Sequence, residues 1–185
     1  MKPIFLTAQK VQAVLESEEW QFCFIGGVAL QRWAVPRLTN DVDLTLLTGL
    51  GNEEKYIHSI LNHFEPRIDD AADFALRNRV LLVSHGNVGI DISLGALEFE
   101  ESAVERSSNW TPLPDISLRT CSAEDLIVFK SFADRLQDWA DVENILGVQR
   151  DLDWNYIPAQ LEPLVEAKGV PEILTKLFDL RKASE

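Results

Sequence analysis

The sequence predicts an α/β or α+β fold, in which a core of strands and helices is followed by a part made only of helices. Strand-like runs and helical patterns alternate over about the first two thirds of the chain, and only helical patterns follow residue 122. A length of 185 residues suits one core with a small helical extension. We therefore divide the chain into a core over residues 1–121 and a helical C-terminal subdomain packed on it over residues 122–185.

The chain begins with the pattern of a helix and then of a buried strand. Thr7 is placed to cap a helix over residues 8–20, in which apolar residues recur three and four positions apart. The apolar and aromatic run over residues 21–25 predicts a short buried strand.

A glycine pair separates this strand from the next elements. Gly26 and Gly27 break the run, and residues 28–33 follow as a short helix until Pro36 stops it. Residues 41–47 then alternate with the period of two that is typical of a strand.

The middle of the chain predicts a helix and a β-hairpin. A glycine-rich turn precedes a helical pattern over residues 53–64. Strand-like runs at 79–84 and 89–94 flank a turn at 85–87, which is the pattern of a hairpin. Two further segments are less defined: 67–76, which is ambiguous, and 98–106, which fits a short helix or an irregular segment.

The remainder of the chain predicts helices only. Ser122 opens a segment that resembles a capping box, with Asp125 at the position that reaches back. A helical pattern continues to about residue 146, with a break expected near 134–137. Two more helices are expected over residues 154–167 and 170–182.

The charge balance excludes one class of function. Seventeen Lys and Arg against 30 Asp and Glu give a net charge of −13 and a pI near 4.6. Such a chain does not bind nucleic acid mainly through a basic surface. Binding of phosphate groups would need a local device, such as a metal ion, a helix N-terminus or a few focused cations.

The sequence carries no signal for secretion or membrane insertion. Cys23 and Cys121 are too few for a disulfide framework, and no apolar run approaches the roughly 20 residues of a membrane span. The N-terminus lacks the apolar stretch and cleavage site of a signal peptide. We therefore expect a cytoplasmic protein without a membrane partner.

Asp41 and Asp43 are the residues that call for a chemical explanation. They stand two positions apart in a predicted strand, so both point to the same face of the sheet. Neighbouring carboxylates repel each other and Asp is depleted in strands, so a compensating charge is expected. Mg²⁺ prefers such oxygen ligands. Asp91 alternates with Ile90 and Ile92, and an adjacent strand would bring it beside the pair to complete a metal site.

The acids also fit a plain structural interpretation, because Asp-x-Asp after a turn is typical of a solvated strand edge without a metal. The glycine pair favours the chemical interpretation. At a junction of strand and helix, missing Cβ atoms let backbone N–H groups approach a phosphate. Each feature alone is weak, but their order along the chain points to phosphate chemistry.

In this order the residues resemble the nucleotidyltransferase superfamily that includes DNA polymerase β, with a glycine pair, Asp-x-Asp and a later third Asp. They resemble more closely the AbiEii-like nucleotidyltransferases, the toxins of one group of toxin–antitoxin and abortive-infection systems. That family reads approximately Gly-Gly-x-Ala-Leu and then Arg-x-Thr-x-Asp-hydrophobic-Asp. The matching residues are Gly26, Gly27, Ala29, Leu30, Arg37, Thr39, Asp41 and Asp43.

A later helical motif extends the resemblance, which covers about residues 20–147. The family has a Lys followed by an Arg and by Asp-x-x-Asp, and the matching residues are Lys130, Arg135, Asp138 and Asp141. The resemblance implies a nucleotidyltransferase-like mixed β-sheet core flanked by helices, and it implies an enzyme that depends on Mg²⁺.

The resemblance also implies roles for these residues. Asp41 and Asp43 would hold one or two Mg²⁺ ions that bridge the triphosphate, and Asp91 would be the third ligand or the base that takes the acceptor's proton. Gly26 and Gly27 would cradle the phosphates. Further nucleotide contacts are expected from Arg37, Thr39 and Lys130, the last as a catalytic cation at the phosphates.

Three positions keep a second interpretation. Arg37 contacts a phosphate or merely neutralises the acids of the strand. Lys130 binds phosphate or pairs with Asp134, four residues later on the same helix. Val28 stands where the family often has Ser or Thr, which leaves the phosphate contacts to the backbone.

The expected reaction moves NMP from an NTP to an acceptor hydroxyl and releases pyrophosphate. The acceptor is an RNA end, such as that of tRNA, or a small molecule, such as an aminoglycoside. A toxin role implies a protein antitoxin as partner. The alternative is a catalytically degenerate module of the same fold that binds a nucleotide or a protein partner.

Overall fold

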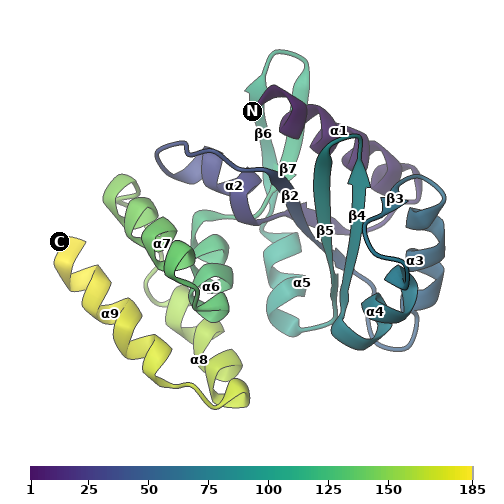
Figure 1. Ribbon diagram of the computed structural model, residues 1–185. Coiled ribbons are helices and arrows are strands. Elements are labelled where there is room, and N and C mark those ends of the chain that lie inside the picture. The colour runs from purple at the N-terminus through teal and green to yellow at the C-terminus, as the bar shows by residue number, and fades with distance from the viewer. Residues whose placement is uncertain (185) are drawn as a thin grey trace. The chain divides into compact units, whose positions relative to one another are not determined.

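The computed structural model describes residues 1–184 (Figure 1). These residues group into two units. The first unit contains residues 1–28 and 38–121, and the second contains residues 29–37 together with the chain from residue 122 onward. Residues 29–37, which the sequence analysis placed in the core, thus group with the C-terminal helices.

A mixed sheet of seven strands forms the centre of the first unit and confirms the predicted core. The strands follow one another across the sheet in the order β3-β4-β5-β2-β1-β7-β6. Their bounds are β1 Phe22–Phe24, β2 Asp41–Leu47, β3 Glu65–Pro66, β4 Val80–His85, β5 Val88–Gly95, β6 Ser108–Leu113 and β7 Ile116–Thr120. The pairs β2–β5 and β1–β7 are parallel, and the other neighbouring strands are antiparallel.

Alternation along β2 divides the two faces of this sheet. Val42, Leu44 and Leu46 are fully buried in the apolar core, whereas Asp41 and Asp43 take the opposite face and are only half-buried. This is the period-two pattern that the sequence predicted. A central strand therefore supplies both core residues and polar site residues.

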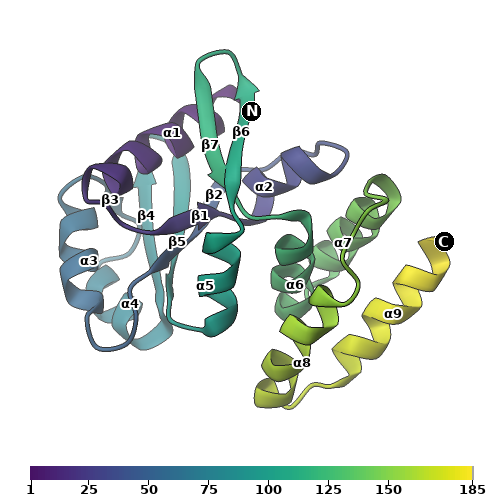
Figure 2. The same ribbon diagram turned by 180° about the vertical axis from the view of Figure 1, so that it is seen from behind.

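Helices cover both faces. On the core side, α1 (Lys2–Ser17), α3 (Glu53–Leu61) and α4 (Ala71–Asn78) contribute buried apolar residues to the same cluster as the strands, and both ribbon views show α1 running along the sheet (Figures 1 and 2). On the polar side, α5 (Glu98–Glu105) is tied to β2, because Thr45 Oγ1 donates to Glu100 Oε1 at 3.0 Å.

Helices form the second unit. They are the part of α2 (Gly26–Trp33) from Ala29 onward, α6 (Ala123–Ala133), α7 (Leu136–Val148), α8 (Tyr156–Lys168) and α9 (Glu172–Ser184). Ser122 caps α6 as expected, since its hydroxyl accepts from the Asp125 N–H at 3.1 Å. The predicted break is real: Asp134 takes a left-handed conformation with a φ of 57° and ends α6.

The first helix starts earlier than the sequence analysis expected. It begins at Lys2 rather than at residue 8, because Pro3 suits the first turn of a helix and Ile4 and Phe5 are buried. Thr7 lies inside the helix, so the capping role predicted for it was wrong.

Four elements were not predicted, and the short strand β3 is one of them. The segment left ambiguous at 67–76 contains the start of α4, and a hairpin of β6 and β7 lies where no strand was expected. Pro112 and the polar residues around it mask the strand pattern of β6 in the sequence. The proline is tolerated there because β6 is an edge strand. No helix among residues 1–184 is both long and apolar enough to cross a membrane.

Candidate functional site

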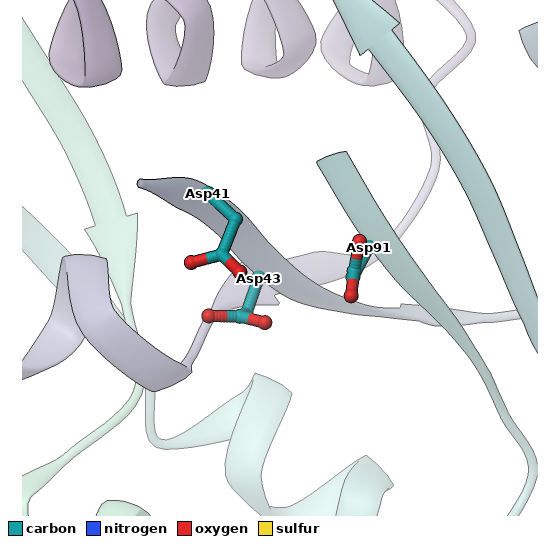
Figure 3. Close-up of side chains that lie close together, drawn as sticks. All are labelled: Asp41, Asp43 and Asp91. Atoms are coloured by element: carbon teal, nitrogen blue, oxygen red, sulfur yellow. The ribbon is translucent and has the colours of Figure 1, made fainter. Parts of the chain in front are cut away.

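Three carboxylates meet on the polar face of the sheet. The parallel register of β2 and β5 places Asp43 directly beside Asp91, and it pairs Asp41 with Gly89. One oxygen from each of the three Asp side chains lies within 4.8 Å of the others. Figure 3 shows the carboxylates pointing away from α1. The strand pattern alone had suggested this grouping, and the register is what produces it.

Backbone and hydroxyl groups hold two of these carboxylates. The Gly27 N–H donates to Asp43 Oδ2 at 3.3 Å, and Thr39 Oγ1 donates to Asp41 Oδ1 at 3.2 Å. Gly27 lies in the first turn of α2, where backbone N–H groups and the helix dipole favour a negative charge. Thr39 and the glycine pair therefore belong to the same site as the acids.

The glycine pair is required by packing inside the site. Gly26 has a φ of +51°, and a Cβ on it would lie 2.1 Å from Asp43 Oδ2 and 2.7 Å from Asp43 Cβ. A Cβ on Gly27 would lie 2.2 Å from Thr39 Oγ1. From the sequence alone, the pair is explained by the approach of phosphate. The structure adds an internal reason, which is that side chains of the site already occupy this space.

Val28 follows the glycine pair and has no exposed surface. It packs in the apolar core of the first unit. The position at which the resemblance implies a hydroxyl therefore belongs to the core in this chain.

Arg67 is a further member of this cluster that no sequence motif predicts. The Arg67 guanidinium donates to Asp91 Oδ1 and forms an ion pair with it, and both side chains are about one-third exposed. Arg67 falls in the segment with an ambiguous pattern, and no motif marks it. Only the pairing of β3, β4 and β5 brings this residue to the acids.

A second cluster of charges lies within the second unit. Lys130 Nζ lies 3.1 Å from Asp138 Oδ1 and 2.6 Å from Asp141 Oδ2, and its side chain is only 5% exposed. Arg37 donates two hydrogen bonds of 2.7 Å to Asp141, from Nε to Oδ1 and from Nη2 to Oδ2. Arg135 Nε donates to Asp138 Oδ2 at 2.5 Å. Three cations thus share two buried acids.

The break between α6 and α7 decides the partners of Lys130. The alternative pairing with Asp134 assumed a straight helix, but Asp134 ends α6 and accepts from Trp139 Nε1 at 2.6 Å. After the break, α7 presents Asp138 and Asp141 to Lys130. The suggested i,i+4 pair is therefore replaced by ion pairs across the turn.

The pKa of Asp141 reflects these contacts. Burial alone would raise the pKa of its carboxyl, but hydrogen bonds from Arg37 and Lys130 outweigh burial and hold the pKa below its ordinary value of 3.8. Asp141 therefore stays ionised in the folded protein below the pH at which it is protonated in the unfolded chain.

We predict that Gly26→Ala destabilises the first unit by more than about 1 kcal/mol, because the new Cβ meets Asp43 and the φ is positive. Denaturant unfolding measures the change. Gly147→Ala is the matched control, since Gly147 lies in α7 with no atom within 4 Å of its missing Cβ. That substitution should be neutral or stabilising by up to about 1 kcal/mol. Equal stability of Gly26→Ala and wild type would contradict the close approach.

We predict that Asp141→Asn lowers the free energy of unfolding by about 3 kcal/mol or more at pH 7, because it removes the buried negative charge that Lys130 and Arg37 share and leaves Lys130 with Asp138 alone. A depressed pKa stabilises the fold fully above 3.8, and this contribution is lost as the pH falls through the folded-state value. The difference between variant and wild type should therefore shrink as the pH falls below 3.8. Unfolding at several pH values tests this, with Asp115→Asn in the exposed β6–β7 turn as control. A difference that stays constant with pH would disprove it.

Comparisons with known proteins agree with this architecture. The family described as nucleotidyl transferase AbiEii toxin, type IV TA system, matches residues 11–183 of the chain. A search of curated proteins finds no match.

Two solved structures are similar in fold. One is ANT(2″)-Ia in complex with adenylyl-2″-tobramycin, at 15% identity and a TM-score of 0.50, over 100% of both chains. The other is the lincosamide antibiotic adenylyltransferase LnuA with lincomycin bound, at 14% identity and a TM-score of 0.50, over 75% of this chain and 94% of the other. The family match spans nearly the whole chain and agrees with the glycine pair and the three acids, and on that ground the protein belongs to the AbiEii nucleotidyltransferase toxin family.

Proposed function

We propose that this protein transfers NMP from an NTP to an acceptor hydroxyl at the site formed by Asp41, Asp43 and Asp91. The observation that carries the proposal is the meeting of three carboxylate oxygens within 4.8 Å beside the first turn of α2. Family membership makes the chain a nucleotidyltransferase, and the proposal assigns the chemistry to these residues.

The three carboxylates suit a divalent metal ion. They offer oxygen ligands only, they lie close enough to share an ion, and each is partly exposed to solvent. Mg²⁺ is the expected ion, because it binds a few carboxylates together with substrate phosphates. When bound, it would neutralise charge on the triphosphate and on the departing pyrophosphate. Asp41 and Asp43 would hold it, and Asp91 would be either the third ligand or the base that takes the acceptor's proton.

The reaction itself needs little covalent work from the protein. The acceptor oxygen forms a bond to the α-phosphorus as the bond to the oxygen that bridges the α- and β-phosphates breaks, and pyrophosphate leaves with that oxygen. The hydroxyl proton passes to a carboxylate oxygen, a role that suits Asp91. The backbone N–H groups of the α2 N-terminus would orient the phosphates. Positioning and charge stabilisation would thus supply most of the catalysis.

The cluster of the second unit gives the proposed nucleotide contacts of Lys130 and Arg37 a physical basis. Lys130, Arg37 and Arg135 gather their positive charges beside Asp138 and Asp141 in a chain of net −13. Arg37 is one-third exposed and Arg135 is largely exposed, so this charge reaches the surface. Such a surface would attract a triphosphate.

We propose two classes of acceptor for this reaction. An RNA end, such as that of tRNA, suits a toxin of a toxin–antitoxin family, and a protein antitoxin is the expected partner. A small hydroxyl compound is the other class, and the solved structures of similar fold were determined with antibiotics or their adenylyl products. Incubation with labelled NTPs, Mg²⁺ and either total RNA or aminoglycosides separates the two.

We predict that Asp41→Asn and Asp43→Asn each reduce label transfer at least about 100-fold, because each removes a charge from the proposed metal site. Asp115→Asn changes the net charge equally in an exposed turn and should keep full activity. Transfer that is equal in all three variants and wild type would exclude the site.

Calorimetry with NTP and Mg²⁺ addresses the alternative of a degenerate module. The buried Val28 in place of a hydroxyl favours this alternative. Binding of nucleotide without transfer to any acceptor would support it, whereas no binding of metal or nucleotide would support a purely structural role for the acids.

We predict that Lys130→Ala weakens NTP binding about tenfold or more if Lys130 reaches phosphate, because a cation is lost. Asp138→Asn is the matched control, since it breaks the same buried pair without removing a cation. Both variants should lose stability. If both variants fold and neither of them loses affinity for the nucleotide, Lys130 has a structural role only.

A further inference from the structure

Arg67, β4 and the acids lie on one line across the sheet. The Arg67 N–H donates to the Leu82 carbonyl at 3.1 Å, which ties the residue after β3 to the middle of β4. Leu82 is in register with Asp91 of β5, and Asp91 is in register with Asp43 of β2. Residues in register on neighbouring strands point to the same face. The fold therefore directs the Arg67 side chain across β4 toward the three acids.

Gly89 provides the space for the guanidinium. It stands two residues before Asp91 on β5, and a Cβ on it would lie 2.8 Å from Arg67 Nη1 and 3.8 Å from Asp41 Cβ. The backbone of Gly89 does not need a glycine, because its φ is not in the left-handed region. The absence of a side chain at this position thus serves to seat the guanidinium between Gly89 and Asp91.

The Arg67 guanidinium supplies positive charge beside the acids, as a bound metal ion would. Three carboxylates within 4.8 Å repel one another, and Arg67 brings a positive charge into direct contact with Asp91. Arg67 and a divalent ion therefore compete for the same carboxylate charge. The pair is about one-third exposed on both sides, and such ion pairs contribute little stability, so a divalent ion can displace the guanidinium.

We propose that Arg67 is a positioning residue that holds Asp91 and stands in for the metal as a counter-charge, so that metal binding at the acids requires the release of Asp91 from Arg67. The inference rests on the proposed metal-dependent function. It adds that the metal affinity of the site is set by an arginine outside the family motif and by the glycine that seats it.

The test is Mg²⁺ and Mn²⁺ titration by calorimetry on the full chain, without nucleotide. Arg67→Ala should bind the metal at least about fivefold more tightly than wild type, which is the effect of removing one nearby charge even under water-like screening. Its melting temperature without metal should fall only slightly, and the stabilisation that saturating metal gives should grow. A purely structural role for Arg67 would lower the melting temperature but leave the metal affinity unchanged.

Gly89→Ala tests the seat without changing any charge. The new Cβ displaces only the flexible end of Arg67 and meets Asp41 at an ordinary contact distance, so the protein should fold. The metal affinity should rise toward that of Arg67→Ala. The double variant should gain nothing over Arg67→Ala, because no guanidinium is left to displace.

Arg77→Ala is the matched control. Arg77 is an exposed arginine of α4 that donates to the Asp73 carbonyl of its own helix, so its loss changes the net charge equally. Its metal affinity should equal that of wild type. Unchanged metal affinity in both Arg67→Ala and Gly89→Ala would overturn the inference while wild-type binding of metal still upholds the proposed function. Absence of metal binding in every variant would overturn both.

Discussion

The parallel pairing of β2 with β5 is the constraint on which the site depends. It brings Asp91 beside Asp43 although they stand 48 positions apart in the chain, and the alternation of both strands turns their acids to one face. The same alternation buries Val42, Leu44 and Leu46 in the core. A shift of register by one residue would exchange the two faces, so core packing fixes the position of the acids.

Each unit contains clustered carboxylates whose mutual repulsion must be compensated. In the first unit, half-exposed acids gather around a helix N-terminus, a threonine and Arg67, and this arrangement leaves them able to bind a cation. In the second unit, Asp138 and Asp141 are almost fully buried and are neutralised by Lys130 and two arginines. The acids of the first unit are exposed enough to exchange ligands, whereas those of the second unit already have their counter-charges within the protein.

The sequence sufficed where local pattern controls structure. Residues 41–47 alternate clearly, Ser122 caps α6, and the glycine pair with Asp41 and Asp43 carries the family resemblance. It did not suffice where distant pairing decides. Pro112 masks the pattern of the edge strand β6. The partners of Lys130 depend on the left-handed conformation of Asp134, which ends α6. Arg67 contacts Asp91 only because β3, β4 and β5 pair with one another.

The packing around Gly26 and Gly27 changes how sequences of this family should be compared. Asp43 and Thr39 occupy the space that side chains at these two positions would need. A descendant that had lost its chemistry but kept these two neighbours would still be selected to retain both glycines. The glycine pair is thus a marker of ancestry and of packing. Loss of the aspartates would be the earlier sign that a lineage had abandoned catalysis.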